Sequence, residues 1–365
     1  MAKLTLPNVK LPALHIPSFG KQKLSIGLDI GSHAVKICEM TDTGKGFQLL
    51  SFGSAILPPE AMEDGALQDP EAVAKVISAL IKNLKIKGKK VAISISGYSV
   101  IVKKINLAVM SEEELEDHIQ SEAEQYIPFD IDDVYLDFQD LKTNTEEEDR
   151  TDVMLVAAKK DVVDGYLDML KNAGLQTVVV DVDAFALENA YGANFGTEGN
   201  VALIDIGASK MNINIVSQGT SILARDVVLG SRQLTEQIQN HFSLDFEEAE
   251  SIKVGQTAAG DRQEELEGIF ASACGQWITE IKRALDFYYS NHPEEKIDKI
   301  VLSGGGAKIN GLDQFFHNET GIPVQIFNPF INAETDPTKI DPLYLKFMAP
   351  EMALSAGLAT RPVEV

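Results

Sequence analysis

Two short segments of the sequence share one pattern, in which an apolar stretch ends in Asp-Ile-Gly and a serine follows within two residues. The positions that correspond are Asp29, Gly31 and Ser32 in the first copy and Asp205, Gly207 and Ser209 in the second. Glycine allows backbone N–H groups to approach an anion closely, and the serine hydroxyls can add donors. The two aspartates can hold a hydrated Mg²⁺. Both segments therefore predict turns that bind phosphate together with Mg²⁺.

A third glycine turn and a lysine suit the same chemistry. The three glycines at 304–306 follow an apolar stretch at 299–302 and leave room for a flat ring and its ribose against the backbone. Lys36 lies seven residues after Asp29 and can reach a β- or γ-phosphate as a point charge. Each piece alone is also typical of an ordinary turn, so it is their order along the chain that predicts a nucleotide site.

The residues around these turns predict α/β structure. Asp69 and Pro70 supply the N-cap and the first residue of a helix, in which apolar residues recur every three or four positions. Predicted strands lie at 24–30, 34–39, 46–55 and 90–96. The two Asp-Ile-Gly copies are 176 residues apart, nearly half of the chain, which fits duplication of a whole domain.

A small α+β insert is predicted between the two copies, at 103–182. Ser111 and Glu114 form a capping box at the start of one helix, and a second helix ends near Gly174. Strands surround these helices in the order strand–helix–strand–strand–helix–strand. Residues 111–150 hold sixteen Asp and Glu against two basic residues. Either a solvated acidic face or a basic partner explains this charge.

Composition limits the classes of function. The 365 residues are 44% hydrophobic and 24% charged, which is typical of a globular protein of two or three domains. The formal net charge of −23 argues against nucleic acid as a partner. No apolar run is long enough to cross a membrane, and Cys38 and Cys274 match no metal spacing. A reduced, cytosolic protein is therefore expected.

Residues 1–23 differ in composition from the rest of the chain. Pro7, Pro12 and Pro17 exclude a continuous helix and favour an extended N-terminal arm, which is both basic and apolar. Disorder, packing along a sheet edge, and contact with a membrane or a partner all fit this composition.

Taken in order, the three glycine segments resemble the nucleotide-binding segments of the actin-like superfamily, two for phosphates and one for adenosine. The resemblance implies a two-lobed α/β fold of duplicated ribonuclease-H-like domains, with ATP and Mg²⁺ between the lobes. It also implies a backbone contact from His33 to phosphate, and contacts from Glu250 and Lys253 to ribose and adenine. An ordinary surface pair on a helix explains Glu250 and Lys253 equally well. The implied cofactor-binding residues are Asp29, Gly31, Ser32, His33, Lys36, Asp205, Gly207, Ser209, Glu250, Lys253, Gly304, Gly305, Gly306 and Lys308, with Asp29 and Asp205 holding Mg²⁺ through water.

Within that superfamily, the insert and the runs at 110–128, 155–160 and 280–288 resemble the PilM family of type IV pilus assembly proteins. The resemblance implies a cytoplasmic protein held at the inner membrane by its partners. It implies a groove beside the insert that binds the cytoplasmic N-terminal tail of a PilN-like membrane protein. Other inner-membrane and motor components of the pilus machine, and further copies of the chain, are additional partners to expect.

The expected division of the chain follows from these segments. We expect an arm, a first lobe, the insert and a second lobe, whose final helix returns to the first lobe. The corresponding ranges are 1–23, 24–102, 103–182 and 183–360, with a helical subdomain at about 231–298.

Two other functions fit parts of the same pattern. One is an FtsA-like cell-division protein, although the residues at 359–365 lack the apolar face of its membrane-binding helix. The other is a sugar or acid kinase of the superfamily, for which Asp183 is the one candidate base. Hydrolysis in this superfamily depends on where a single water lies, so slow ATPase activity and ATP binding alone both stay open.

Overall fold

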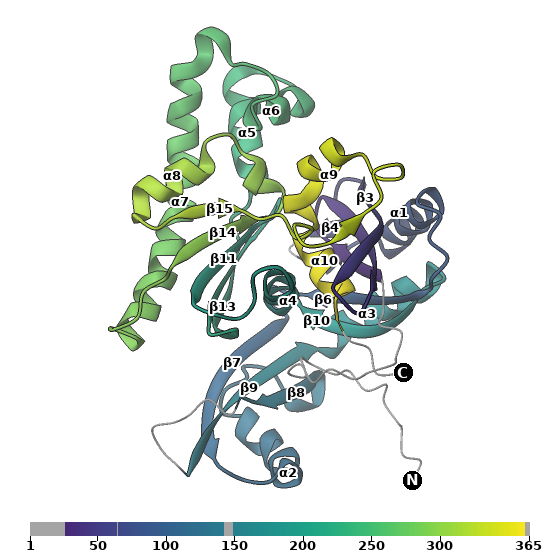
Figure 1. The fold of residues 1–365 in the computed structure, drawn as a ribbon, viewed down its shortest axis with the longest axis vertical. Helices are drawn as coiled ribbons and strands as arrows, with labels where there is room; N and C mark the ends of the chain where they lie inside the picture. The colour runs from purple at the N-terminus through teal and green to yellow at the C-terminus, as the bar shows by residue number, and fades with distance from the viewer. Residues whose placement is uncertain (1–25, 64, 142–148, 362–365) are drawn as a thin grey trace.

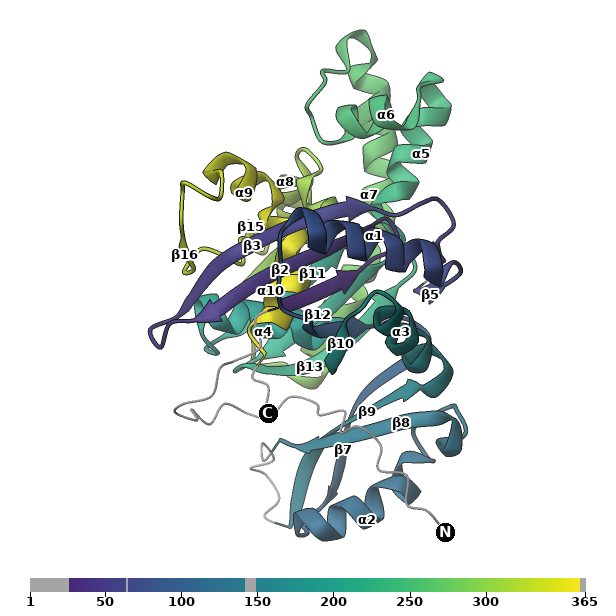
Figure 2. The same cartoon turned by 90° about the vertical axis from the view of Figure 1, so that its right-hand side faces the viewer.

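The computed structural model describes residues 26–63, 65–141 and 149–361, and the predicted arm at 1–23 lies outside these ranges. Two lobes, each built on a β-sheet, lie side by side, and a smaller insert projects from their base (Figures 1 and 2). The two-lobed α/β fold expected from the duplicated turns is confirmed. Among the described residues, no helix is both long and apolar enough to cross a membrane.

The first lobe surrounds a mixed sheet. Its elements are β1 (Ile26–Ile30), β2 (Ala34–Asp42), β3 (Phe47–Ile56), β4 (Met62–Glu63), β5 (Ala66–Leu67), α1 (Pro70–Asn83), β6 (Lys90–Ile95), α3 (Lys160–Asn172), β10 (Gln176–Val182), β16 (Glu334–Thr335), α9 (Pro342–Met348) and η4 (Ala349–Met352). The sheet order is β10-β6-β1-β2-β3-β16. Helices α1 and α3 cover one face, and η4 packs against β2 and β3 on the other. The expected cap of α1 is present, because the Asp69 carboxylate accepts the Ala72 N–H at 3.0 Å.

The second lobe surrounds a five-stranded sheet. Its elements are β11 (Asn200–Ile206), β12 (Met211–Ser217), β13 (Thr220–Val227), α5 (Ser231–Phe242), α6 (Phe246–Lys253), η2 (Gly260–Arg262), α7 (Gln263–Asn291), β14 (Lys299–Ser303), η3 (Gly305–Lys308), α8 (Leu312–Thr320) and β15 (Val324–Ile326). The sheet order is β13-β12-β11-β14-β15. Apolar side chains from α5, α7 and α8 pack on the outer face of this sheet, with Trp277 and Tyr288 fully buried among them.

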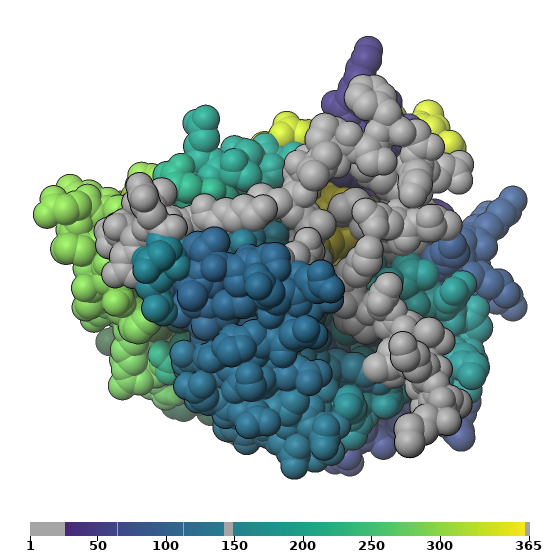
Figure 3. Space-filling view, turned by 90° about the horizontal axis from the view of Figure 1, so that it is seen from below, coloured from purple at the N-terminus to yellow at the C-terminus, as the bar shows by residue number. Residues whose placement is uncertain are grey.

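The insert is smaller than the range 103–182 predicts. It consists of β7 (Val100–Ala108), α2 (Glu112–Ala123), η1 (Ile131–Asp133), β8 (Val134–Asp140) and β9 (Arg150–Lys159). The strands form a separate sheet with the order β7-β9-β8, on which α2 packs, and the expected capping box at Ser111 is present. Seen from below, the insert forms a rounded projection in front of the lobes (Figure 3).

The rest of the predicted insert belongs to the first lobe. Strand β10 pairs in parallel with β6, and α3 packs against α1 in the first-lobe core. The sequence shows a strand and a helix at 160–182, but the pattern of a buried strand is the same whichever sheet it joins. The insert expected at 103–182 is therefore corrected to Val100–Lys159.

Two helices fill the space between the sheets of the two lobes. They are α4 (Asp183–Phe195) and α10 (Ala353–Ala359), and together with both sheets they form one apolar core. Glycines allow this close packing. A Cβ at Gly27 in β1 would lie 2.0 Å from the Ser355 carbonyl oxygen of α10, and one at Gly357 would lie 1.8 Å from the Ala186 carbonyl oxygen of α4. The final helix thus packs against β1 of the first lobe.

We expect Gly357→Ala to destabilise the protein, because its methyl group would meet the backbone of α4, which cannot move without separating the layers. The cost should be roughly 3 kcal/mol. The matched control is Gly192→Ala in α4, where a Cβ has open space and helix propensity should add about 0.5–1 kcal/mol of stability. Thermal melting of both variants checks this. A Gly357→Ala protein as stable as wild type would contradict the packing described here.

Candidate functional site

The three glycine segments come together at the ends of strands from both lobes. Strand β1 runs parallel to β6, and β11 runs parallel to β14. The first turn follows β1, the second turn follows β11, and the glycines at 304–306 follow β14. Ligands of open α/β sheets bind beyond the carboxyl ends of such strands. A ligand of these turns would therefore lie between the lobes, where the turns at 29–32, 205–209 and 304–306 meet; this place is the cleft.

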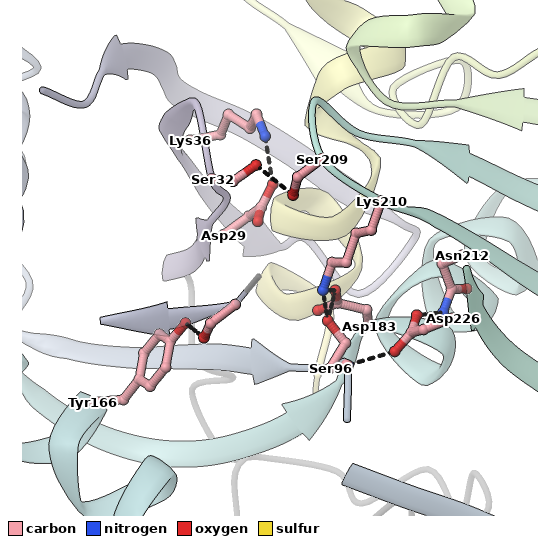
Figure 4. Close-up of polar contacts among 12 residues, drawn as sticks. Asp29, Ser32, Lys36, Ser96, Tyr166, Asp183, Ser209, Lys210, Asn212 and Asp226 are labelled. Carbon is pink, nitrogen blue, oxygen red and sulfur yellow. Dashed lines mark hydrogen bonds and ion pairs between the residues drawn. The ribbon is translucent and has the colours of Figure 1, made fainter. Parts of the chain in front are cut away.

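The two Asp-Ile-Gly turns have the same local geometry. The Gly31 N–H donates to the Ala34 carbonyl at 3.1 Å, and the Gly207 N–H donates to the Lys210 carbonyl at 2.9 Å. The turns face each other across the cleft, and the Ser209 hydroxyl donates to the Ser32 hydroxyl at 2.8 Å (Figure 4). Two hydroxyl groups, one from each lobe, thus meet at the point where a phosphate would be bound.

Acidic and basic groups line the same place. The Lys36 ammonium lies 3.0 Å from the Asp29 carboxylate, and this neighbour raises the pKa of Lys36 although burial opposes it. Burial raises the pKa of Asp29 despite the lysine. Burial also raises the pKa of Asp205 to about 6, and the Ser303 hydroxyl donates to its carboxylate at 2.8 Å.

These carboxylates suit a hydrated Mg²⁺. Asp29 and Asp205 come from opposite lobes, and the charge of Asp29 contributes to the raised pKa of Asp205. Mg²⁺ usually keeps several waters and takes one or two carboxylates together with phosphate oxygens. The described residues contain no cluster of three or more His, Cys, Asp or Glu that would hold a metal alone.

The third turn presents one open glycine between two packed ones. Gly304 has φ of +80°, and a Cβ there would lie 2.4 Å from the Ile206 carbonyl oxygen. A Cβ at Gly306 would lie 2.3 Å from the Ile206 side chain, whereas Gly305 has only Glu351 nearby, at 4.0 Å. Two of the three glycines thus serve close packing against β11. Only Gly305 has open space where a side chain would lie.

The remaining predicted residues surround this cleft. Lys308 forms an ion pair with Glu351, and its ammonium lies 3.8 Å above the centre of the Phe347 ring. His33, in the first turn, lies across the cleft from Phe246 of α6, with 6.2 Å between the ring centres.

Glu250 and Lys253 do not form an exposed pair. The Lys253 side chain is only 4% exposed, and its ammonium donates to the Thr235 hydroxyl of α5 at 2.8 Å. The Glu250 carboxylate accepts from the same hydroxyl and pairs with Lys253. The i,i+3 ion pair of the alternative interpretation is thus present, but its lysine is buried at the junction of α5 and α6.

One cluster at the base of the cleft was not expected from the sequence. Lys210, next to the second turn, lies 3.2 Å from the Asp183 carboxylate at the start of α4 and also contacts the Ser96 hydroxyl after β6 (Figure 4). Ser96 also donates to Asp183. Burial opposes ionisation of Asp183, but Lys210 and the hydroxyl donors lower its pKa overall. Its carboxylate is thus committed to structural partners.

A second link joins the lobes below this cluster. The Asp226 carboxylate of β13 accepts hydrogen bonds from the Gly97 N–H and from the Asn212 amide, the latter at 2.8 Å. Asn212 occupies the position in the second copy that Lys36 has in the first. Of these groups, the sequence singled out Asp183 as a candidate base, and the only signal for Lys210 was its adjacency to the second Asp-Ile-Gly turn.

A groove opens beside the insert. It has a volume of about 400 Å³ and lies between β7 of the insert and β13 of the second lobe. Each of these strands is at the edge of its sheet. The apolar side chains that line it include Val100, Val102, Val182, Ala224 and Val228. An extended peptide could pair with a free strand edge there and place side chains against this apolar wall.

We expect Asp205→Asn to stabilise the ligand-free protein at pH 7.5. The wild-type carboxyl has a pKa of about 6, above its ordinary value of 3.8, so the folded protein loses stability as the pH rises from 3.8 to 6 and keeps the full loss above 6. The gain should be on the order of 1 kcal/mol, since Asp205 is partly exposed, and should disappear as the pH falls toward 4. Melting curves across this pH range check it, with exposed Asp261→Asn as control. A lower melting temperature at pH 7.5 would refute this account.

Comparison with known proteins gives one family. The model of a family described as type IV pilus assembly protein PilM matches residues 27–363. The structure is also similar to a solved PilM–PilN type IV pilus biogenesis complex, at 28% identity and a TM-score of 0.82. This similarity covers 93% of this chain and 99% of that chain.

More distant relatives share the fold. MreB5 of Spiroplasma citri bound to ADP is 14% identical with a TM-score of 0.50, over 91% of this chain and 94% of that chain. The cell shape-determining protein Mbl of Bacillus cereus is 26% identical over 163 residues, which are 36% of this chain. The match spans 49% of that relative's length. These similarities place the two lobes in the actin-like fold.

Proposed function

Because this chain belongs to the PilM family of type IV pilus assembly proteins, we propose that it binds ATP with Mg²⁺ between its lobes and docks the tail of a membrane partner beside its insert. The partner is the cytoplasmic N-terminal tail of a PilN-like inner-membrane protein. In this role the chain is a cytoplasmic component of the pilus assembly machine, held at the membrane by what it binds.

The observation that carries the nucleotide proposal is the meeting of the two turns at Ser32 and Ser209. Lys36 supplies a positive charge to the phosphates, and Asp29 and Asp205 supply oxygens to the water shell of Mg²⁺. The adenosine lies over the open surface of Gly305, between η3 and α6. The carboxylate pair across the cleft and the glycine turn are both compatible with this arrangement.

The groove between β7 and β13 supports the docking proposal. It offers two strand edges and an apolar wall to an extended peptide, and helix α2 of the neighbouring insert exposes several acidic side chains. A tail that precedes a membrane span commonly carries basic residues on its cytoplasmic side. The acidic insert would attract such a tail, and apolar side chains in the groove would set its register. The solved PilM–PilN complex is the relative that suggests this partner.

A kinase function is poorly supported by the same geometry. The one candidate base, Asp183, is held by Lys210 and Ser96, and its pKa is lowered. A general base near neutral pH needs a pKa close to that pH and a free lone pair toward the substrate hydroxyl. Asp183 lacks such a pKa, and the Oδ2 atom of its carboxylate is already bonded to Lys210 and Ser96.

Two binding measurements on the full chain test the proposal. Titration calorimetry with MgATP and MgADP should give saturable one-site binding, whereas no heat at millimolar nucleotide would reject the cofactor. Fluorescence anisotropy with the labelled N-terminal tail of the organism's PilN homologue should give micromolar or tighter binding, with an on-rate that falls as salt rises. A tail that does not bind even at low salt would reject the partner.

A further inference from the structure

Arg232, an arginine that has no hydrogen-bond or ion-pair partner among the described side chains, lies at the second turn. Arg232 is the second residue of α5, whose start is fixed on the turn: the Ser231 N–H donates to the Gly207 carbonyl at 2.9 Å, and the Arg232 N–H donates to the Ala208 carbonyl at 3.0 Å. Gly230 permits this approach, because a Cβ there would lie 2.2 Å from the Ala208 carbonyl oxygen. The backbone of Arg232 is therefore held rigidly against the predicted phosphate turn.

The side chain of Arg232 differs from every other arginine in the described residues. Its Nε is buried without a hydrogen-bond partner, and its guanidinium has no ion pair or ring contact there. The other five arginines have a partner: Arg225 and Arg283 pair with Glu280, Arg361 pairs with Asp181, Arg150 bonds to Asn106, and Arg262 lies over Phe242. Arg232 is half-buried, and among the described residues no carboxylate is paired with it.

The surroundings of Arg232 are cationic. Its charge is one of the causes, after burial, that lower the pKa of His33 in the first turn, and it contributes to the lowered pKa of Lys253 in α6. Lys36 also acts on His33. The one carboxylate among these groups, Glu250, is already paired with Lys253. Burying a cation beside other cations costs folding free energy unless an anion binds among them. The position of Arg232 therefore favours an anionic ligand.

We propose that Arg232 is a phosphate ligand supplied by the second lobe, which holds the α- and β-phosphates of the bound nucleotide. This inference rests on the proposed nucleotide binding. The backbone of Arg232 is bonded to the second turn, and its charge acts on Lys253 of α6, the helix beside the proposed ribose position. The part of a nucleotide that connects those two places is the α- and β-phosphate pair. The planar fork of an arginine suits two oxygens of such a chain.

The experiment compares Arg232→Gln with the matched control Arg262→Gln in the full-length protein. Calorimetry is run with MgATP, MgADP and adenosine. Arg232→Gln should weaken ATP and ADP equally, by at least tenfold, and leave adenosine unchanged. Arg232→Lys should recover part of the loss, and the log–log dependence of affinity on salt should be shallower for Arg232→Gln. The control should bind all three ligands like wild type.

The outcomes separate this inference from the function on which it rests. Wild type that binds neither ATP nor ADP overturns the nucleotide proposal and the role of Arg232 with it. Wild type that binds both, with Arg232→Gln unchanged, overturns only the role of Arg232. Loss of ATP affinity without loss of ADP affinity would overturn the placement at the α- and β-phosphates. The melting temperature of ligand-free Arg232→Gln shows whether the variant is folded. It should not be lower than that of wild type, since the substitution removes a cation without a partner.

Discussion

Gly305→Asp should abolish the rise in melting temperature that millimolar MgATP gives to the wild-type protein. Gly305 is the open glycine of the third turn, so an aspartate fits the ligand-free fold but places a carboxylate where adenosine would lie. A ligand at a concentration of a thousand times its Kd raises the free energy of unfolding by about 4 kcal/mol. The variant should lose this stabilisation. Thermal melting with and without MgATP measures it.

The neighbouring Gly304 provides the matched comparison. Gly304→Ala would need an alanine at φ of +80° with its Cβ 2.4 Å from a backbone oxygen of β11. This variant should melt at a lower temperature without ligand, whereas Gly305→Asp should melt like wild type. If Gly305→Asp retains the full MgATP shift, adenosine does not lie over this turn, and the proposed orientation of the nucleotide fails.

Excising the insert should remove tail binding and leave the MgATP shift intact. The ends of the insert lie side by side, because Val100 and Ala158 are partners in the β7–β9 ladder and the Lys159 N–H donates to the Ser99 carbonyl at 2.9 Å. Two glycines can therefore join Ser99 to Lys159 with little strain. Anisotropy with the labelled PilN-like tail should show at least a hundredfold loss, because β7 and its wall of the groove are gone.

Single substitutions give an independent version of this test. Ala224→Arg fills the groove from the second lobe without changing the insert, and should weaken tail binding by at least tenfold. Val109→Asp changes an exposed apolar residue of the insert outside the groove and should have no effect. Full tail binding by the excised protein would place the docking site elsewhere.

Local signals in the sequence predicted much of the fold because they depend on residues close together in the chain. The N-cap at Asp69, the capping box at Ser111 and the three glycine turns each lie within a few residues, and all appear in the structure. The duplicated Asp-Ile-Gly turns predicted the two lobes, since two copies of one strand–turn–strand pattern imply two similar sheets. The boundary of the insert was wrong because the partner of β10 is a strand more than eighty positions away.

The unexpected groups of the site depend on contacts between distant elements. Lys210, Asp183 and Ser96 come from three segments far apart in the chain and meet only once both lobes are assembled. Burial of Lys253 depends on how α6 packs against α5, which a pattern of charges on one helix cannot reveal. The lack of a partner for Arg232 is likewise a property of the whole cleft.

The position of α10 also determines when during synthesis the first lobe can fold. Residues 353–359 complete the core over β1, and the short strand at 334–335 joins the edge of the same sheet beside β3. A ribosome adds about 5–20 residues each second, so the nascent first lobe waits many seconds for the segments that close it. During that time the face of β1 that α10 covers is exposed to chaperones and proteases. Chains that stop before residue 353 should be recognised by cellular quality control as unfinished, and should not accumulate as a half-functional lobe.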